Sequence, residues 1–586
     1  MNLASIRLSL FSLLILLCLV SHGEDIAFPP EAGVRNVCRD FGAKGDGVTD
    51  DTAAFQAAYK ETGLLYVPNG TYLISDSIVA PDRKGSASCR RILQGQSTEK
   101  TILKLKDGAK GFGDPRKPKP LWKVTWDVKI AQAFRNGVRN ITFDTGKGNP
   151  GAVALDYFAS NQGGMHSVVL RSGDRAGVCG LRMDGDNGPL LVKNLLVEGF
   201  DVGIEAAANH LATMEHITLK NQNVCGMKVT NKTIIRNLVS QNEVPAIDAR
   251  TPQIILLDAR LTGGKGVAMS LSARMALVRN LTVEGYATAL KTKSEEIPGP
   301  HIAEWSSRPA DSLFPSTART LNLPVKETPE IAWDPPSKWV DATAGSKSKD
   351  VTDSFQRAID SGATTVYFPR GEWQFGDVRV RGAVRRIIGM ESTVKTKGCR
   401  LIVEEGTEPV VAIERFDTIY AKLTIEHAAR RTLLVSSMVA DAIVCKQGCG
   451  ELFLEDVCLG HMDIRKNAVW ARQLNPEYGE RPAVINDGGT FWLLGLKTEG
   501  YCTKVQAING SRTEVFGYVL ANKAENKFPM FILEDSAFSA CIVEDAIRKG
   551  PFSVLVEETR KGEKKKMPGA AKGAAGSALP LFVSTP

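Results

Sequence analysis

Residues 37–72 read VCRDFGAKGDGVTDDTAAFQAAYKETGLLYVPNGTY, and residues 340–373 read VDATAGSKSKDVTDSFQRAIDSGATTVYFPRGEW. The residues repeated at an offset of 300 positions are Asp50, Thr52, Phe55, Gln56 and Ala58. A Pro-x-Gly-x-aromatic turn follows in both copies. Each copy predicts a short helix, begun at a capping Asp or Thr, whose apolar face covers the open end of the sheet that follows. The chain therefore opens the same kind of folding unit twice.

Short β-branched phrases repeat downstream of the first copy. Their second residues are Ile141, Val168, Leu195, Ile217, Leu238, Arg260 and Leu281. A strand every 21–27 residues, with Gly and Asn between, favours a parallel β-helix, in which each coil buries its apolar face by stacking on its neighbours. The residues Asn140, Asn194, Asn237 and Asn280 precede strands at equivalent points. They predict an asparagine ladder along the stack.

The repeat and a change in composition set the expected domain boundaries. Residues 293–338 hold eight of the 28 prolines and no strand rhythm, which is typical of a linker. We expect a signal peptide at 1–23, an N-terminal β-helix at 24–292, the Pro-rich linker at 293–338, a C-terminal β-helix at 339–559 and a basic disordered tail at 560–586.

The first residues have the pattern of a secretory signal. Arg7 precedes an apolar run from Leu8 to Val20, and the small residues Ser21 and Gly23 stand at −3 and −1 of the expected cleavage before Glu24. The run is too short to span a bilayer, so we expect a secreted, periplasmic or cell-surface protein without stable membrane insertion. Export permits disulfides, and the ten cysteines beyond the signal leave both free thiols and one or two bridges open.

The formal net charge of +8 does not indicate a polyanion-binding surface. The tail contributes +5 and the signal +1, which leaves +2 for the 536 residues between them. A nearly neutral body predicts no nucleic-acid partner. The oligomeric state is not set by these features.

Two glutamates recur at the spacing of one coil. Trp470-x-x-x-Leu474-x-x-Glu477 repeats 22 residues later and ends at Glu499. The two carboxyl groups should lie on adjacent coils, about 4.8 Å apart at the backbone. Like charges this close should keep one group protonated, and a protonated acid beside an ionised partner suits the protonation of a glycosidic oxygen. We therefore predict Glu499 as the general acid and Glu477 as its partner.

Several neighbouring side chains are candidates for holding a sugar. The expected substrate-binding residues are Arg472, Gln473 and Asn475 beside the first glutamate, Gln162 in the N-terminal β-helix, and Trp122 and Trp126 as ring-stacking groups. The sequence Asp184-Gly-Asp186-Asn187-Gly188 resembles a calcium loop but lacks its terminal Glu, so we predict no metal site.

Two segments resemble a known family. The phrase DFGAKGDGVTDDTAAFQAA, residues 40–58, resembles the opening of the pectate-lyase-like right-handed β-helices. Two such β-helices joined by a linker, together with residues 469–500, are similar in layout to glycoside hydrolase family 55, the exo-acting β-1,3-glucanases. The resemblance implies two tandem right-handed parallel β-helices and inverting hydrolysis of a β-glucan without a cofactor.

The leading hypothesis is thus an exported enzyme that cleaves a polysaccharide in the groove between two β-helices. One alternative is a pectate-lyase-type polysaccharide lyase on uronates, which would need a basic residue and usually calcium. A second alternative is a non-catalytic, glycan-binding surface β-helix. The sequence does not name the sugar, the linkage, or exo or endo action.

Overall fold

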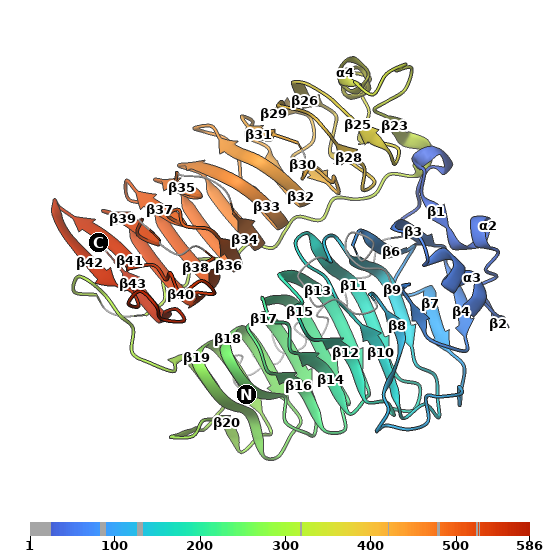
Figure 1. Ribbon diagram of the computed structural model, residues 1–586, viewed down its shortest axis with the longest axis horizontal. Helices are drawn as coiled ribbons and strands as arrows, with labels where there is room; N and C mark the ends of the chain where they lie inside the picture. Colours follow the sequence, from blue (N-terminus) through green and yellow to red (C-terminus); the bar gives the residue numbers. More distant parts are fainter. Residues whose placement is uncertain are drawn as a thin grey trace, which may run out of the picture.

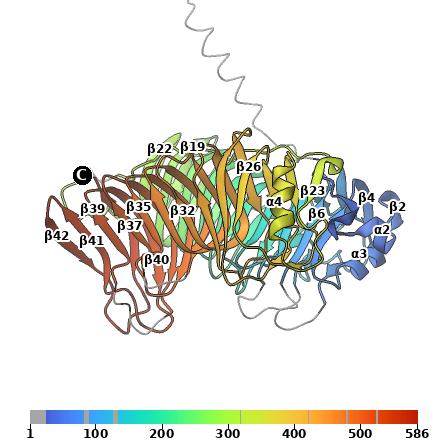
Figure 2. The ribbon, with the colours of Figure 1, turned by 90° about the horizontal axis from the view of Figure 1, so that it is seen from above.

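The computed structural model describes residues 25–81, 89–125, 133–316, 319–419, 421–477, 481–522, 526 and 528–585. These residues form two parallel β-helices, one built on a 22-stranded and the other on a 19-stranded sheet. The two lie side by side and run in the same direction, from the blue and yellow ends to the green and red ends (Figures 1 and 2). The predicted tandem β-helix fold is confirmed. The expected signal peptide lies outside the described residues.

The strands of the first sheet are β1 (Arg35–Asn36), β2 (Asp46–Asp50), β3 (Gly63–Val67), β4 (Gly70–Ile74), β5 (Ile78–Val79), β6 (Arg91–Gly95), β7 (Thr101–Leu105), β8 (Lys119–Lys123), β9 (Gly137–Asp144), β10 (Ala152–Asp156), β11 (Gly163–Arg171), β12 (Cys179–Met183), β13 (Leu190–Glu198), β14 (Val202–Ala206), β15 (Ala212–Lys220), β16 (Cys225–Val229), β17 (Thr233–Gln241), β18 (Ile247–Thr262), β19 (Val267–Glu284), β20 (Thr288–Lys291), β21 (Glu296–Ile297) and β22 (His301–Ser306).

The later strands are β23 (Trp339–Asp341), β24 (Thr365–Tyr367), β25 (Glu372–Trp373), β26 (Val378–Gly382), β27 (Arg386–Ile388), β28 (Thr393–Val394), β29 (Cys399–Gly406), β30 (Val410–Glu414), β31 (Leu423–His427), β32 (Thr432–Cys445), β33 (Leu452–Arg465), β34 (Ala468–Pro476), β35 (Val484–Asp487), β36 (Thr490–Glu499), β37 (Val505–Ile508), β38 (Arg512–Leu520), β39 (Phe531–Glu534), β40 (Ala537–Asp545), β41 (Val554–Arg560), β42 (Glu563–Pro568) and β43 (Ala578–Ser584). All but β25 and β28, which pair with each other, belong to the second sheet.

Each β-helix opens with the predicted short helix. Helix α3 (Thr52–Ala58) follows the smaller α2 (Val37–Phe41) in the first, and α4 (Thr352–Asp360) opens the second. Asp50 accepts the Thr52 N–H at 3.0 Å, and Asp350 accepts the Thr352 N–H at the same distance. Both helices bury a phenylalanine in the end of the stack. The repeated sequence thus builds the same cap twice.

The stacked strands follow the predicted period. The residues in register are Ile141, Val168, Leu195, Ile217, Leu238, Ala259 and Leu281. The sixth coil is therefore aligned through Ala259, so the prediction of Arg260 was wrong by one residue. The preceding residues turn the corner of each coil with a left-handed backbone, at φ between 54° and 57°. Asn, Asp and His adopt this region more readily than other side chains, which explains the asparagine ladder.

The start of the predicted linker and the predicted tail are both more ordered than expected. Strand β22 pairs antiparallel with β19, so the first sheet extends past residue 292. Strands β42 and β43 pair antiparallel with β41 and β40. The prediction of a disordered tail after residue 560 was therefore wrong. Apolar residues from Leu579 to Val583 are buried against the last coil, and the low-complexity stretch before them hid this short strand.

One apolar cluster joins the two β-helices and the linker. Its members include Leu211, Ile255 and Leu277 from the first β-helix, Leu323 and Ile331 from the linker, and Trp470, Trp492, Phe516 and Tyr518 from the second. At Gly495 a Cβ atom would lie 2.1 Å from Thr213 Oγ1 of the first β-helix. The two stacks are thus in direct contact along this junction.

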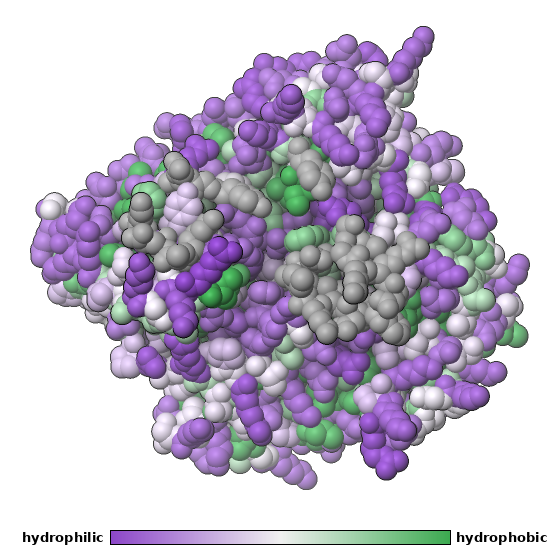
Figure 3. Space-filling view, viewed as in Figure 1, coloured by the Kyte–Doolittle hydropathy of each residue, from purple (hydrophilic) through white to green (hydrophobic). Residues whose placement is uncertain are grey.

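The large apolar side chains exposed among the described residues are Val48, Val224, Ile419, Phe528 and Ile547. The face in Figure 3 is mostly hydrophilic, with apolar residues in small scattered patches. Among the described residues, no helix is long and apolar enough to cross a membrane. The ten cysteines from Cys38 to Cys541 are free thiols in this structure.

Candidate active site

Two adjacent strands carry the predicted glutamates to the same place. Strands β34 and β36 pair with Trp470 opposite Trp492 and Leu474 opposite Leu496. The leucines are buried in the core of the second β-helix, and the tryptophans pack against the other β-helix and the linker. Glu477 and Glu499 follow at equivalent points, so packing on both faces of the strands fixes their positions.

A lysine lies between the two carboxylates. Lys497 Nζ donates to Glu477 Oε1 at 2.8 Å and to Glu499 Oε1 at 2.5 Å. The side chain of Lys497 is 3% exposed, against 12% for Glu477 and 31% for Glu499. Burial would lower the pKa of Lys497, but the two carboxylates outweigh it and hold that pKa above its usual value. The direct repulsion expected between two bare carboxylates is therefore offset by an ammonium group.

Amides fix the remaining carboxylate contacts. Asn475 Nδ2 donates to Glu477 Oε1 at 2.8 Å and to Asn161 Oδ1, across the junction, at 2.9 Å. Asn522 Nδ2 donates to Glu499 Oε2 at 2.8 Å. We call Glu477, Lys497 and Glu499 the carboxylate–lysine cluster. Its shared ammonium leaves one net negative charge, and because Glu499 is its most exposed member, that residue is best placed to meet a ligand.

A second lysine supports the turn after β36. Lys504 Nζ donates to the main-chain carbonyl of Glu499 at 2.5 Å and lies 3.3 Å from that of Gly500. Burial lowers the pKa of Lys504 to about 8. This lysine holds the backbone that presents Glu499, and among the described residues its ammonium is not hydrogen-bonded to either carboxylate.

The first β-helix brings Gln162 and its neighbours to the same junction. Gln162 is buried, has a left-handed backbone at φ 58°, and donates from Nε2 to Cys458 Sγ. Asp456, on the same strand as Cys458, accepts a hydrogen bond from the Gln162 backbone. Burial raises the pKa of Asp456 to about 7 although Arg135 and Arg139 lower it. A buried acid that titrates near neutrality is a feature of functional sites.

Three of the predicted sugar-binding residues are instead structural. Arg472 is fully buried, and its Nε donates to Glu215 Oε2 at 3.0 Å. Gln473 is 2% exposed and accepts a hydrogen bond from Thr213 at 2.8 Å. Trp122 is buried in the core of the first β-helix beside Phe55, Tyr59 and Phe143. These predictions were wrong because all three side chains are used in packing; Trp126 lies outside the described residues.

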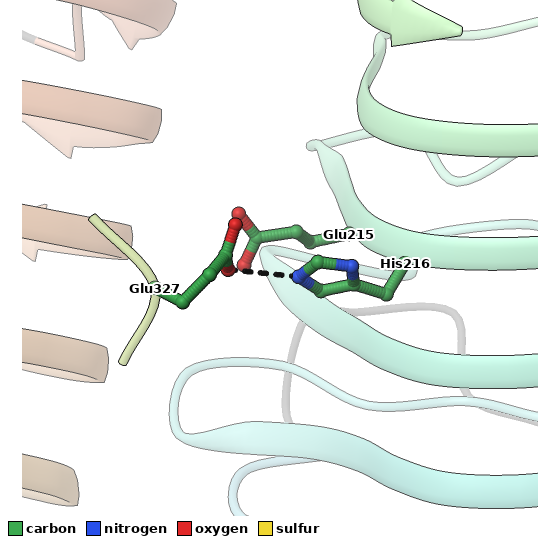
Figure 4. A group of neighbouring side chains, drawn as sticks. All are labelled: Glu215, His216 and Glu327. Carbon is green, nitrogen blue, oxygen red and sulfur yellow. Dashed lines mark hydrogen bonds and ion pairs between the residues drawn. The ribbon is translucent and has the colours of Figure 1, made fainter. Parts of the chain in front are cut away.

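The residues beside Arg472 form the one group with metal-ligand spacing found among the described residues. Glu215, His216 and Glu327 offer ligand atoms within 4.8 Å of one another (Figure 4). However, Arg236 donates to Glu215 at 2.5 Å and to Glu327 at 2.8 Å, and Arg472 also binds Glu215. A cation would have to compete with two guanidinium groups. The group fits an ion-pair network better than a metal site.

Sequence reasoning missed Lys497 and Asn522. Alternate residues of a strand point to the same face, so Lys497 two positions before Glu499 was readable as its neighbour, as was Asn475 two positions before Glu477. Asn522 lies on the next coil, 23 residues after Glu499. The 22-residue period places Ala521, and not Asn522, at the position equivalent to Glu499. The contact of Asn475 with Asn161 had no sequence signal, because it depends on how the two stacks dock.

The chain has relatives among polysaccharide-related proteins. A profile of the family described as "Rhamnogalacturonase A/epimerase, pectate lyase-like" matches residues 34–248. Alginate lyase 7 of Azotobacter vinelandii is 33% identical over 113 residues, 18% of this chain and 11% of that protein. Mannuronan C5-epimerase AlgE4 of the same organism is 31% identical over 128 residues, 20% of this chain and 21% of that protein. The chain thus spans about a fifth or less of these relatives.

Among solved structures, sacteLam55A from Streptomyces sp. SirexAA-E aligns over 97% of this chain and 100% of that chain, at 10% identity and a TM-score of 0.46. The A-module of AlgE4 aligns over 90% of this chain and 100% of that one, at 13% identity and a TM-score of 0.25. The profile match falls on the first stack of coils. Over residues 34–248 the first β-helix is thus similar to the pectate-lyase-like family.

Proposed function

We propose that this protein is an exported glycoside hydrolase that cleaves a β-glucan-like polysaccharide at the junction of the two β-helices. The carboxylate–lysine cluster is the observation that carries the proposal. The names of the relatives, alginate lyase and mannuronan epimerase, support a carbohydrate-active enzyme in general. The choice of a glucan comes from the resemblance of the sequence to glycoside hydrolase family 55.

In this proposal Glu499 protonates the glycosidic oxygen. Two carboxylates share the single ammonium of Lys497, so one added proton neutralises the cluster at a site where charge is poorly hydrated. When Glu499 takes that proton, Glu477 retains Lys497. Glu499 then gives the proton to the leaving sugar. The resulting carboxylate is stabilised by its ion pair with Lys497, and this stabilisation favours bond cleavage.

The geometry argues against Glu477 as the second catalytic carboxylate of an inverting enzyme. Two oxygens bound to one ammonium lie within about 5 Å, closer than the roughly 6.5–9.5 Å that inverting glycosidases leave for a water. Glu477 is also poorly exposed and already accepts bonds from Lys497 and Asn475. Its proposed role is to position and balance Glu499, and the attacking water is held by other groups.

The lyase alternative requires a base that removes a proton next to a carboxylate. Lys497, the basic residue that binds the Glu499 carboxylate, has a raised pKa that keeps it protonated at neutral pH. Lys504 has a pKa of about 8, but it is fully buried and its ammonium is bound to the main-chain carbonyls of Glu499 and Gly500. A protonated ammonium cannot act as a base. This observation favours hydrolysis over elimination.

The test is turnover of a soluble β-1,3-glucan and of polygalacturonate by the full mature chain. We expect reducing ends from the glucan without ultraviolet-absorbing unsaturated products. Glu499→Gln should lower kcat by about 10²–10⁴-fold, the contribution of a lost general acid. Glu534→Gln, at an exposed glutamate that ends β39, is the matched control and should be unchanged. Unsaturated products would support the lyase, and glycan binding without turnover would support the non-catalytic alternative.

A further inference from the structure

A separate cavity lies on the linker side of the junction. It has a volume of about 500 Å³ and shares no lining residue with the carboxylate–lysine cluster. The coil corners Asn140 and Asn194 line it from the first β-helix, Arg415 from the second, and Trp333 from the linker. Its rim reaches solvent at Glu327, whose side chain is 51% exposed. A cavity of this size holds one or two sugar rings.

Four arginines and two glutamates, drawn from both β-helices, gather at and just behind the cavity wall. Arg135 and Arg139 share Glu391, and Arg386 pairs with Glu414. Arg415 lies near both glutamates but forms no ion pair with a carboxylate among the described residues. Of these four guanidinium groups, Arg415 is the one outside an ion pair in the part of the chain that the structure describes; Glu327, Glu330 and Glu455 also line the cavity. The other lining cation, Lys193, is already paired with Glu455.

Arg415 is the guanidinium left over. Among the described residues its side chain makes one hydrogen bond, from Nη1 to Gln94 Oε1 at 3.3 Å. Burial, followed by repulsion from Arg139, lowers the pKa of Arg415 to about 10. Its backbone has φ 61°, at a coil corner where Asn or Gly is the usual residue.

The rest of the lining favours a polar ligand. The neutral hydrogen-bonding side chains around the cavity are Gln94, Asn140, Ser167, Asn194, Ser436 and Ser437. Trp333 is not free for stacking, because Arg386 lies 3.7 Å from its ring centroid and Trp339 stacks on it at 5.8 Å. Recognition here depends on hydrogen bonds and charge. The lining matches a ligand with one carboxylate and several hydroxyl groups.

We propose that this cavity is a binding site for a sugar acid, whose carboxylate pairs with Arg415 and whose hydroxyls bond the amide and hydroxyl side chains around it. The guanidinium offers up to five N–H donors in a planar fork that matches a carboxylate. The site is distinct from the proposed catalytic cluster, so occupancy and glucan turnover are separable.

Titration calorimetry of the full mature chain with sodium D-glucuronate tests the site, with D-glucose and inorganic phosphate as the other probes. We expect glucuronate to bind at least tenfold more tightly than either. Arg415→Gln should weaken glucuronate binding tenfold or more, while Arg116→Gln, at a side chain that is 89% exposed, should not change it. Asn194→Asp, which adds a negative charge to the cavity, should weaken binding without removing the arginine.

Several results would overturn the proposal: no binding of glucuronate, equal binding of glucose, tighter binding of phosphate, or full affinity in Arg415→Gln. Glu499→Gln should bind glucuronate as the wild type does. A protein that binds glucuronate through Arg415 but does not hydrolyse glucan would refute the proposed function alone, and the reverse result would refute this site alone.

Discussion

Replacing Lys497 by Met should shift the pH dependence of activity more than it shifts substrate binding. The variant removes an ammonium that is 3% exposed and bonded to two carboxylates. At about 5 Å, with an effective dielectric constant of about 20, the two bare carboxylates would repel by about 3 kcal/mol, or about 2 pH units. One of them should then keep its proton to higher pH, so the alkaline limb of kcat/KM should move up by about 1–2 units.

The assay is the pH profile of kcat/KM on the glucan, with urea unfolding measured on the same protein. Breaking this buried contact should cost about 3–5 kcal/mol of unfolding free energy. The double variant Lys497→Met with Glu477→Gln removes the repelling charge, and it should recover part of that stability and return the limb toward wild type. Lys497→Arg is the charge-preserving control. An unmoved alkaline limb in a folded, active Lys497→Met enzyme would refute the role given to the cluster.

Three further predictions concern the fold. Gly495→Ala should destabilise the protein by several kcal/mol, because the added Cβ would collide with Thr213 of the other β-helix. Gly510→Ala is the control: its Cβ would have open space, so it should cost only the roughly 1–2 kcal/mol of a left-handed backbone. Equal urea midpoints for the two variants would show that the junction is loosely packed. A chain ending at Arg560 should lose about 6 kcal/mol or more, since the buried apolar residues of β43 would leave the last coil, and an unchanged Tm would contradict their docking. Burial would raise the pKa of Glu455, but Lys193 and other cations outweigh it and lower that pKa to about 2. The ionised Glu455 should therefore stabilise the folded protein fully above about pH 4.3, and this stabilisation should be lost as the pH falls towards 2. Glu455→Gln should flatten this part of the Tm–pH curve.

The coil architecture was predictable because each coil repeats one physical requirement. A strand must bury its apolar side on the next coil, and the corner before it must accept a left-handed backbone. Asn140, Asn194, Asn237 and Asn280 report that corner directly, at φ near 55°. The error at the sixth coil has the same basis, since Asp258 fills the corner there and Asp tolerates this backbone as Asn does.

The contacts between the two β-helices were not predictable. A polar residue on a coil is equally compatible with solvent, a ligand or another stack, and the sequence does not say which face will be covered. Arg472 and Gln473 were expected to hold sugar, yet both lie against the first β-helix, where Glu215 and Thr213 meet them. Their partners lie about 260 positions away, and no local period links such positions.

The carboxylate–lysine cluster was only partly readable for a related reason. The period of 22 residues placed Glu477 and Glu499 on adjacent coils, and the structure has them there. Whether the two carboxylates repel each other depends on the group between them, which is Lys497. The repeat does not reveal this lysine, because Asn475 occupies the equivalent position one coil earlier. That difference turns a symmetric pair of acids into an asymmetric one, since the lysine rises from the coil of Glu499 while the amide rises from the coil of Glu477. The asymmetry gives the two glutamates different surroundings, and it is the reason to assign them different roles.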